Sequence, residues 1–188
     1  MRNSLYANIA FISYKREDEA WAKWLQKKLE HYKLPTEIRK KNPDLEFSEH
    51  PRHVFKDTTD LSGGVLAKAI NEGLGSSKFL IVICSPRAAK SEWVCKEVQK
   101  FIDSGREEYI IPFIIEGEPH AKNKENECFP STLKSLAGER ELLGINVNEN
   151  GREAASVKVA ARMFGLSYDS LWQRFKREEK KRKRSIIA

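Results

Sequence analysis

The sequence predicts an α/β protein with a flavodoxin-like three-layer fold, in which helices flank a five-stranded parallel sheet of strand order 2-1-3-4-5. Strand-sized apolar runs alternate with stretches of helical spacing along the chain, which is typical of repeated strand–helix–strand units. The longest runs, FLIVIC and IIPFII, are apolar throughout, as expected of central parallel strands covered on both faces. A length of 188 residues suits one such domain.

Apolar runs and amphipathic spacing define the elements of the first half of the chain. Apolar residues between positions 17 and 34 recur at helical spacing, with an acidic start and a basic end, and Gly75 ends a second helix. Three prolines between positions 35 and 53 predict a long loop. In order, we expect a strand at 8–14, a helix at 17–34, a loop at 35–53, a strand at 53–57, a turn or mobile loop at 60–64 and a helix at 65–74.

The second half continues the alternation and ends in two helices. The run at 78–85 is continuous and apolar, which favours a central strand, whereas the run at 141–147 is weaker. In order, we expect a strand at 78–85, a helix at 91–101, a strand at 109–115, an irregular connection at 122–140, a strand at 141–147, a helix at 152–165 and a last helix that runs into the tail.

The net charge of +7 is concentrated near the end of the chain. Residues 174–184, RFKREEKKRKR, include eight basic and two acidic residues, so the remainder of the chain is nearly neutral. The charge therefore does not indicate a specific nucleic-acid-binding surface. The three cysteines form no CxxC pair, which is typical of reduced thiols in the cytoplasm. The sequence shows neither a signal peptide nor an apolar run of membrane-spanning length.

A parallel sheet of this order places a ligand site outside the carboxyl ends of its strands, between the first and third strands. The segments that meet there are residues 13–18, 57–64 and 85–91. The helix that starts at Ser91 springs from the last segment and carries Glu97, one turn after Trp93 and one turn before Phe101. Motifs of other α/β families are missing: there is no GxGxxG, GxxxxGK[ST] or GxSxG.

Three stretches, in order, resemble the Toll/interleukin-1 receptor (TIR) domain family. IAFISYKRED is similar to the family's first motif, an apolar strand that ends in Phe-Ile-Ser-Tyr. VFKDTTDLSGG is similar to its second strand and BB loop, and FLIVICSPRAAKSEWVCKEV to its third strand and the helix with the Trp-x-x-x-Glu pattern. The resemblance covers roughly residues 7–165, and it departs from a minimal TIR domain in the insert at 35–53 and in the tail.

The family includes enzymes, many of them bacterial, that cleave NAD+ at the nicotinamide–ribose bond, and the resemblance implies that Glu97 is the catalytic residue. This cleavage builds positive charge on the ribose, which a carboxylate in a partly apolar pocket stabilises better than one in water. NAD+ would be the substrate, hydrolysed or cyclised in bacterial defence or signalling, and no cofactor or metal is expected. The substrate-binding residues that the resemblance implies are Ser13, Tyr14, Lys15, Arg16, Asp57, Leu66 and Trp93.

Each of these residues also has a purely structural interpretation. Glu97 is three residues before Lys100, a spacing typical of ordinary surface ion pairs, and Trp93 is equally suited to anchor the core at the start of its helix. The remaining alternatives are solvated charges for Lys15 and Arg16, a turn cap for Asp57, core packing for Leu66 and a plain strand end for Ser13 and Tyr14.

The glycine-rich stretch at 60–64 has an implied role of its own. In enzymatic TIR domains the BB loop of one subunit completes the site of another, and glycines allow such a loop to move. The resemblance implies self-association through an assembly loop of Asp60, Leu61, Ser62, Gly63 and Gly64. Some family members pair TIR with TIR without turnover, so a non-catalytic interaction module, as a signalling adaptor or host-interfering effector, is the alternative to an enzyme.

The sequence divides into a TIR domain at residues 1–166 and a basic helix or tail at 167–188. The chain ends with a basic cluster followed by SIIA, which has apolar residues at its end. This pattern is typical of the cytoplasmic flank where a membrane helix begins. A membrane tether through a segment beyond Ala188 is therefore one hypothesis. A solvated helix end, and weak binding to anionic lipid or nucleic acid, are the alternatives.

Overall fold

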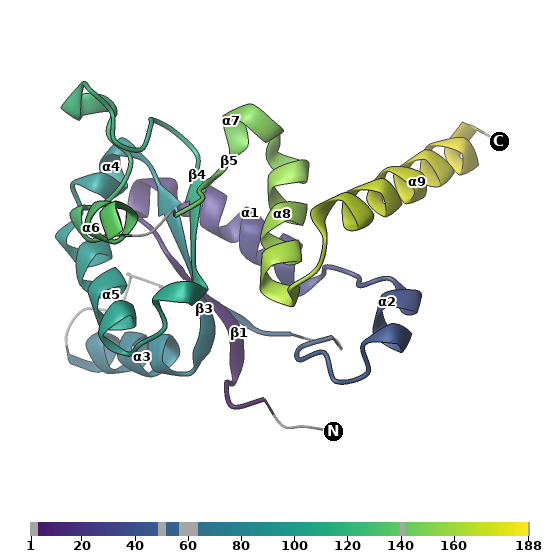
Figure 1. Cartoon of the computed structure of the whole chain (residues 1–188), viewed down its shortest axis with the longest axis horizontal. Coiled ribbons are helices and arrows are strands. Elements are labelled where there is room, and N and C mark those ends of the chain that lie inside the picture. The colour runs from purple at the N-terminus through teal and green to yellow at the C-terminus, as the bar shows by residue number, and fades with distance from the viewer. Residues whose placement is uncertain (1–3, 49–51, 57–63, 140–141, 188) are drawn as a thin grey trace.

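Five parallel strands form the central sheet in the order β2-β1-β3-β4-β5, which confirms the predicted topology (Figure 1). The structure, a computed structural model, describes residues 4–48, 52–56, 64–139 and 142–187. Ala10 in β1 lies opposite Val54 of β2 on one side and Phe79 of β3 on the other. The strands are β1 (Asn8–Ser13), β2 (Val54–Lys56), β3 (Ser77–Cys84), β4 (Ile110–Ile114) and β5 (Ile145–Asn146).

Helices cover both faces of this sheet (Figure 1). One face carries α1 (Glu19–Glu30) and α8 (Arg152–Phe164). The other face carries α3 (Gly64–Gly75), α5 (Glu92–Asp103) and α6 (Ser131–Glu139). The shorter or peripheral elements are α2 (Thr36–Lys41), α4 (Pro86–Ala89), α7 (Val147–Asn150), α9 (Tyr168–Ile187) and the 3-10 turns η1 (Arg16–Asp18), η2 (Glu107–Tyr109) and η3 (Lys124–Asn126).

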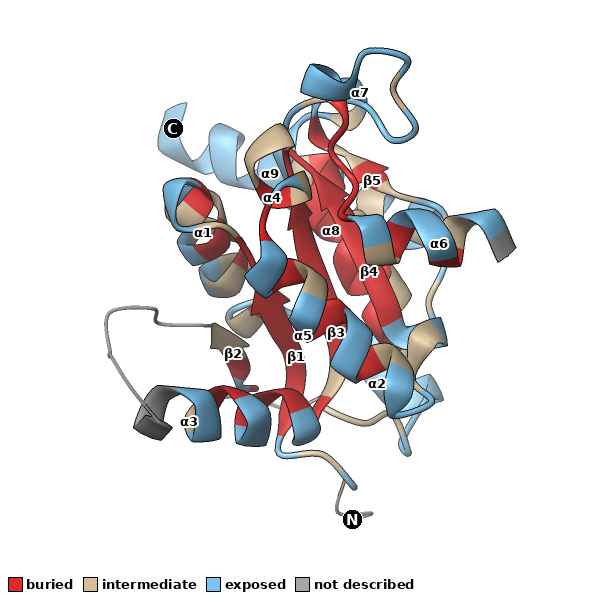
Figure 2. Ribbon diagram, turned by 90° about the vertical axis from the view of Figure 1, so that its left-hand side faces the viewer, coloured by how far each residue is buried: buried red, intermediate tan, exposed pale blue. Residues whose placement is uncertain are grey.

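The strand side chains alternate between two apolar cores. In β3, Ile81 and Ile83 pack with residues of α1 and α8, whereas Leu80 and Val82 pack with residues of α3 and α5. All four side chains are fully buried, and Figure 2 shows the central strands as buried along their length. A strand covered on both faces favours apolar residues at every position. This is the reason why its sequence shows no polar alternation.

The segment that the prolines predicted as a loop contains a short helix, α2, and this prediction was wrong in part. The carbonyl oxygen of Pro35 accepts hydrogen bonds from Ile38 N at 3.0 Å and Arg39 N at 3.1 Å. A proline is compatible with a helix start, because the first N–H groups of a helix have no partner within it. Helix α1 already ends at Glu30, before the predicted end at residue 34. The connection at 122–140, whose helix content the sequence left open, contains α6.

Arg52 ties the end of this insert to the body of the domain. Its side chain is buried and donates to the carbonyl oxygens of Phe47 at 2.9 Å, Leu29 at 3.3 Å and Tyr32. The guanidinium also lies over the Phe164 ring, 5.1 Å from its centroid. Leu29 belongs to the last turn of α1, where carbonyl groups lack helical partners and a cation is favoured.

The last helix, α9, leaves the body of the domain. Gly165 ends α8 with a φ of 63°, a left-handed conformation that glycine adopts without strain. The first turns of α9 pack through Leu171, Trp172 and Phe175, whereas every described residue from Lys176 onward is exposed and the helix projects outward (Figure 1). Among the described helices, none is both long and apolar enough to cross a membrane. The division of the chain at residues 166 and 167 falls between α8 and α9 and stays a prediction.

Candidate functional site

Helix α5 positions the glutamate singled out in the sequence. The Ser91 hydroxyl caps the helix start by accepting a hydrogen bond from Val94 N at 3.3 Å. Val94, Val98 and Phe101 follow at helical spacing and are fully buried. Glu97 lies on the same inward side of the helix, and only 3% of it is exposed. The helix therefore carries a carboxylate among its core-facing residues.

Two side chains hold the carboxylate of Glu97. Trp93, one turn earlier in α5, donates from Nε1 to Glu97 Oε1 at 3.1 Å. Ser13, the last residue of β1, donates from its hydroxyl to Glu97 Oε2. A buried carboxylate requires such donors, because the loss of its hydration is otherwise costly. The Glu97 carboxyl group is thus fixed at the carboxyl edge of the sheet, where ligands of this fold bind.

The structure decides between the alternatives for Glu97 and Trp93. Glu97 is buried, and Lys100 donates to Asn71 Oδ1 at 2.6 Å, so an ordinary surface pair with Lys100 does not describe Glu97. Trp93 is 39% exposed, which excludes the role of a core anchor. Its indole is instead partly open to solvent and donates to the carboxylate, and its role toward a ligand stays a prediction.

Ser13 and Tyr14 belong to different sides of the sheet, as neighbouring strand residues do. Ser13 reaches Glu97 on the α5 side, whereas Tyr14 is 3% exposed and packs in the core on the α1 side. The Tyr14 hydroxyl accepts from Lys56 Nζ at 3.3 Å, and the same ammonium lies 3.3 Å from Glu19. Burial therefore favours the strand-end interpretation for Tyr14, and only Ser13 joins the Glu97 site.

A second polar cluster at this edge of the sheet has no counterpart in the sequence predictions. Asp18 is 2% exposed and accepts hydrogen bonds from Ser85 Oγ at 2.6 Å and from Arg87 Nε and Nη2 at 3.0 and 2.8 Å. Arg87 also pairs with Glu116 at 2.6 Å. The Glu116 and Asp18 carboxylates together raise the pKa of Arg87. The cluster joins the segments that follow β1, β3 and β4 at this edge of the sheet.

The structure describes the other predicted site residues only in part. Lys15 is half-buried and Arg16 is exposed, directly after β1, and their role toward a ligand stays a prediction. Gly64 begins α3 and Leu66 lies in its first turn, but the Leu66 side chain is outside the description. Also outside the described residues lie Asp57, Asp60, Leu61, Ser62 and Gly63.

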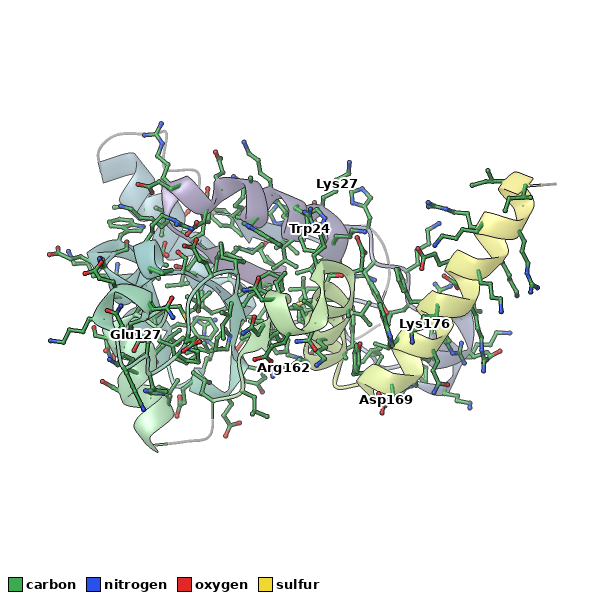
Figure 3. All side chains as sticks on the ribbon, turned by 90° about the horizontal axis from the view of Figure 1, so that it is seen from above. Trp24, Lys27, Glu127, Arg162, Asp169 and Lys176 are labelled. Carbon is green, nitrogen blue, oxygen red and sulfur yellow. The ribbon has the colours of Figure 1, made fainter. Side chains whose placement is uncertain are left out.

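A cavity of about 520 Å³ lies elsewhere, between α1, α8 and the base of α9. Leu29 and Phe175 are among its apolar lining, and Lys27 and Glu178 are among its charged lining. Figure 3 shows Trp24 and Lys27 on α1, with the projecting α9 beyond them. Because charges of both signs surround this cavity, its chemistry selects no ligand, and it shares no residue with the Glu97 site. Within the described part of the chain, no group of three or more His, Cys, Asp or Glu residues is placed to hold a metal ion.

The family model described as TIR domain matches residues 10–143, which include most of β1 and all of β3 and α5. This chain belongs to the TIR-domain family. The resemblance drawn from its three motifs is thereby confirmed, and the sheet order agrees with it.

Two known proteins are similar to this TIR domain. The NAD(+) hydrolase ApTIR of Actinoplanes sp. is 32% identical over 63% of this chain and 19% of its own length. This chain therefore spans only a small part of that relative. TIR domains in the structure of the activated Roq1 resistosome, which directly recognises the pathogen effector XopQ, have a TM-score of 0.53. That alignment covers 82% of this chain and 98% of the other at 19% identity, a likeness of fold alone.

Proposed function

We propose that this TIR domain cleaves NAD+ at the nicotinamide–ribose bond, with Glu97 as the catalytic residue. One observation carries the proposal: a carboxylate that is 3% exposed, held by Ser13 and Trp93 at the carboxyl edge of the sheet. A surface that only binds other proteins gives no reason to bury an anion there, because burial of a carboxylate is costly. A relative that carries the name NAD(+) hydrolase supports the same activity.

The chemistry of this bond explains why one carboxylate suffices. As the bond between the anomeric carbon and the pyridinium nitrogen breaks, positive charge moves onto the ribose. Nicotinamide takes the bonding electron pair and leaves as a neutral molecule, so no general acid is required. The Glu97 carboxylate, largely withdrawn from water, stabilises the developing charge more strongly than an exposed carboxylate does. Ser13 and Trp93 keep it oriented toward the crevice.

The anomeric carbon can then react with either of two nucleophiles. Attack by water gives ADP-ribose and a proton, so the products of hydrolysis are nicotinamide, ADP-ribose and H+. Attack by a nucleophilic atom of the same molecule gives a cyclic form of ADP-ribose. NAD+ is the substrate in both cases, and the proposal needs no separate cofactor.

The setting of the reaction is part of the proposal. Lys15 and Arg16 lie two and three residues after Ser13 and would bind the anionic part of the nucleotide. Self-association of TIR domains, with residues 60–64 completing the site of a neighbour, would switch the activity on. The assembled TIR domains of the structural neighbour support this view.

The cysteines Cys84, Cys95 and Cys128 are free thiols, which supports a reducing cytoplasm as the place of action, in bacterial defence or NAD+ depletion.

The test is nicotinamide release from NAD+ by the 188-residue chain at high protein concentration, beside a Glu97→Ala variant. We expect the variant to lose at least about 100-fold in rate, as removal of a charge-stabilising group does in other enzymes. Lys100→Ala is the matched control, because Lys100 lies in the same helix but on its exposed side. Circular dichroism confirms that each variant folds.

The outcomes separate the candidate functions. Equal release by the parent and Glu97→Ala would exclude Glu97 as the catalytic residue. No release by either, including chains clustered on a multivalent scaffold, would favour an interaction module without turnover. Chromatography of the remaining nucleotide distinguishes ADP-ribose from a cyclic product.

A further inference from the structure

Most of the basic residues in the exposed half of α9 lie on one side of the helix. Successive residues of an α-helix are about 100° apart around the axis. On that spacing Lys176, Arg177, Lys180, Lys181 and Arg184 share one face, about 140° wide, which contains no acidic residue. We call these five residues the basic stripe.

The basic stripe faces away from the domain. Leu171, Trp172 and Phe175, which pack α9 onto the body, lie on the opposite side of the helix by the same spacing. Glu178 and Glu179 lie on the continuation of that packed side. The charges of the two acidic residues in this part of the helix are therefore directed away from the stripe.

The stripe is accessible and its charges are not neutralised by partners. All five members are exposed, and within the described part of the chain none of them forms an ion pair. Lys183, at the edge of the stripe, is paired with Glu179 at 3.4 Å. Exposed cations that repel one another along a helix are stabilised when an anionic surface lies against them.

Ile187 makes a bilayer a better partner for this face than a nucleic acid. It is 86% exposed, and helical spacing places it on the same side as Lys180 and Arg184. Burial of an apolar side chain at the boundary between headgroups and acyl chains lowers the free energy of binding. The phosphates of a nucleic acid offer no apolar surface for this contact. The rest of the chain is nearly neutral in net charge, so it adds little long-range attraction toward a phosphate backbone.

We propose that the basic stripe of α9 binds the surface of a bilayer that contains anionic lipid. The helix would lie on the membrane along its outward face and hold the TIR domain beside it. No membrane-spanning segment is needed for this contact. Electrostatic attraction would bring the helix to the membrane. Salt should therefore weaken the binding, because the Debye length shortens as ionic strength rises.

The experiment is co-sedimentation of the 188-residue chain with phosphatidylcholine vesicles, with and without phosphatidylserine. Lys180→Glu is compared with Arg182→Glu, a change of the same charge on the packed side of the same helix. Each basic residue near an anionic surface strengthens binding about fivefold, so Lys180→Glu, which removes an attraction and adds a repulsion, should weaken binding about 25-fold. The control should lose at most about threefold, because its charge lies across a helix about 10 Å wide and the Debye length is about 8 Å. Glutamate, lysine and arginine are all good helix formers, so both variants should keep α9.

The proposal is supported if the chain sediments only with the vesicles that contain phosphatidylserine and if NaCl weakens this binding. Lys180→Glu should also weaken the binding far more than Arg182→Glu does. Three results would overturn it. One is the absence of binding to phosphatidylserine vesicles, and another is an equal loss in the two variants. The third is displacement of the chain from vesicles by an equal mass of duplex DNA, which would assign the stripe to nucleic acid.

Discussion

Trp93 Nε1 donates a hydrogen bond to Glu97 Oε1 across one turn of α5, at 3.1 Å. The donor is partly exposed and the acceptor is buried, so the indole stands between solvent and the carboxylate. The hydrogen bond from Trp93 therefore fixes the orientation of the Glu97 carboxylate.

The first prediction concerns this hydrogen bond. Trp93→Phe keeps an aromatic ring and removes the N–H donor. Hydrogen bonds to charged groups contribute about 1.5–3 kcal/mol, so we expect nicotinamide release to fall roughly 10- to 100-fold. Trp24→Phe, a half-buried tryptophan of α1 remote from Glu97, is the control and should keep the parental rate. Parental activity in Trp93→Phe, with a loss in Trp93→Ala, would reduce Trp93 to an apolar wall.

The second prediction concerns the contact between β1 and α5. Ser13→Ala removes the hydroxyl that donates to Glu97 and leaves a buried carboxylate with one donor fewer. We expect the free energy of unfolding to fall by about 1–3 kcal/mol in the parent, and by less than half as much when Glu97 is already Gln. Urea denaturation of the four proteins of this cycle measures the coupling. Equal losses in both backgrounds would show that the hydroxyl acts independently of the carboxylate.

The third prediction compares the two carboxylates that contact Arg87. Asp18 is buried and Glu116 is largely exposed, although both lie within 3 Å of the guanidinium. Arg87→Met should destabilise the fold by about 2–3 kcal/mol, because it leaves Asp18 buried without its cation; the partial exposure of Arg87 reduces the loss. Glu116→Gln should cost about 0–1 kcal/mol, as exposed pairs do. Similar urea midpoints for the two variants would contradict this reading of the cluster.

The fourth prediction concerns the thiols. Burial raises the pKa of Cys128 to about 12 and that of Cys84 well above its ordinary value. Because the thiolate is the reactive form, and a raised pKa keeps these groups protonated at neutral and mildly alkaline pH, both should resist alkylation in the native protein. Cys95, which is only half-buried on α5, should react first. Mass spectrometry after iodoacetamide treatment should show one modified thiol per native chain and three in denaturant. Rapid modification of Cys84 or Cys128 would contradict the packing described.

The features that could be predicted from the sequence are those that depend on local spacing. Apolar runs identify the central strands, and the four-residue spacing from Trp93 to Glu97 places both on one side of a helix. The sheet order then brings the start of α5 to the crevice by a general rule of parallel sheets. For these reasons the fold and the position of Glu97 were both accessible without coordinates.

The features that could not be predicted depend on contacts between distant residues. Ser13 and Glu97 are 84 residues apart, and Asp18 and Arg87 are 69 apart, so no motif joins them. Arg52 appears in the sequence as one more basic residue of a polar insert, although it is buried in the structure. Short elements such as α2 and α4 lack enough residues for a periodic signal.

In the proposed reaction, the negative charge of Glu97 stabilises the positive charge that develops on the ribose. The most direct measurement is nicotinamide release from NAD+ by the Glu97→Gln variant, whose side chain has nearly the same shape. Its amide oxygen can accept the hydrogen bond from Trp93, and its amide nitrogen can donate to the Ser13 hydroxyl. We predict a folded protein whose rate is lower by at least about 100-fold, because a neutral amide cannot stabilise the charge that develops on the ribose. Release by Glu97→Gln at the parental rate would contradict the account, because the charge would then have no part in the reaction.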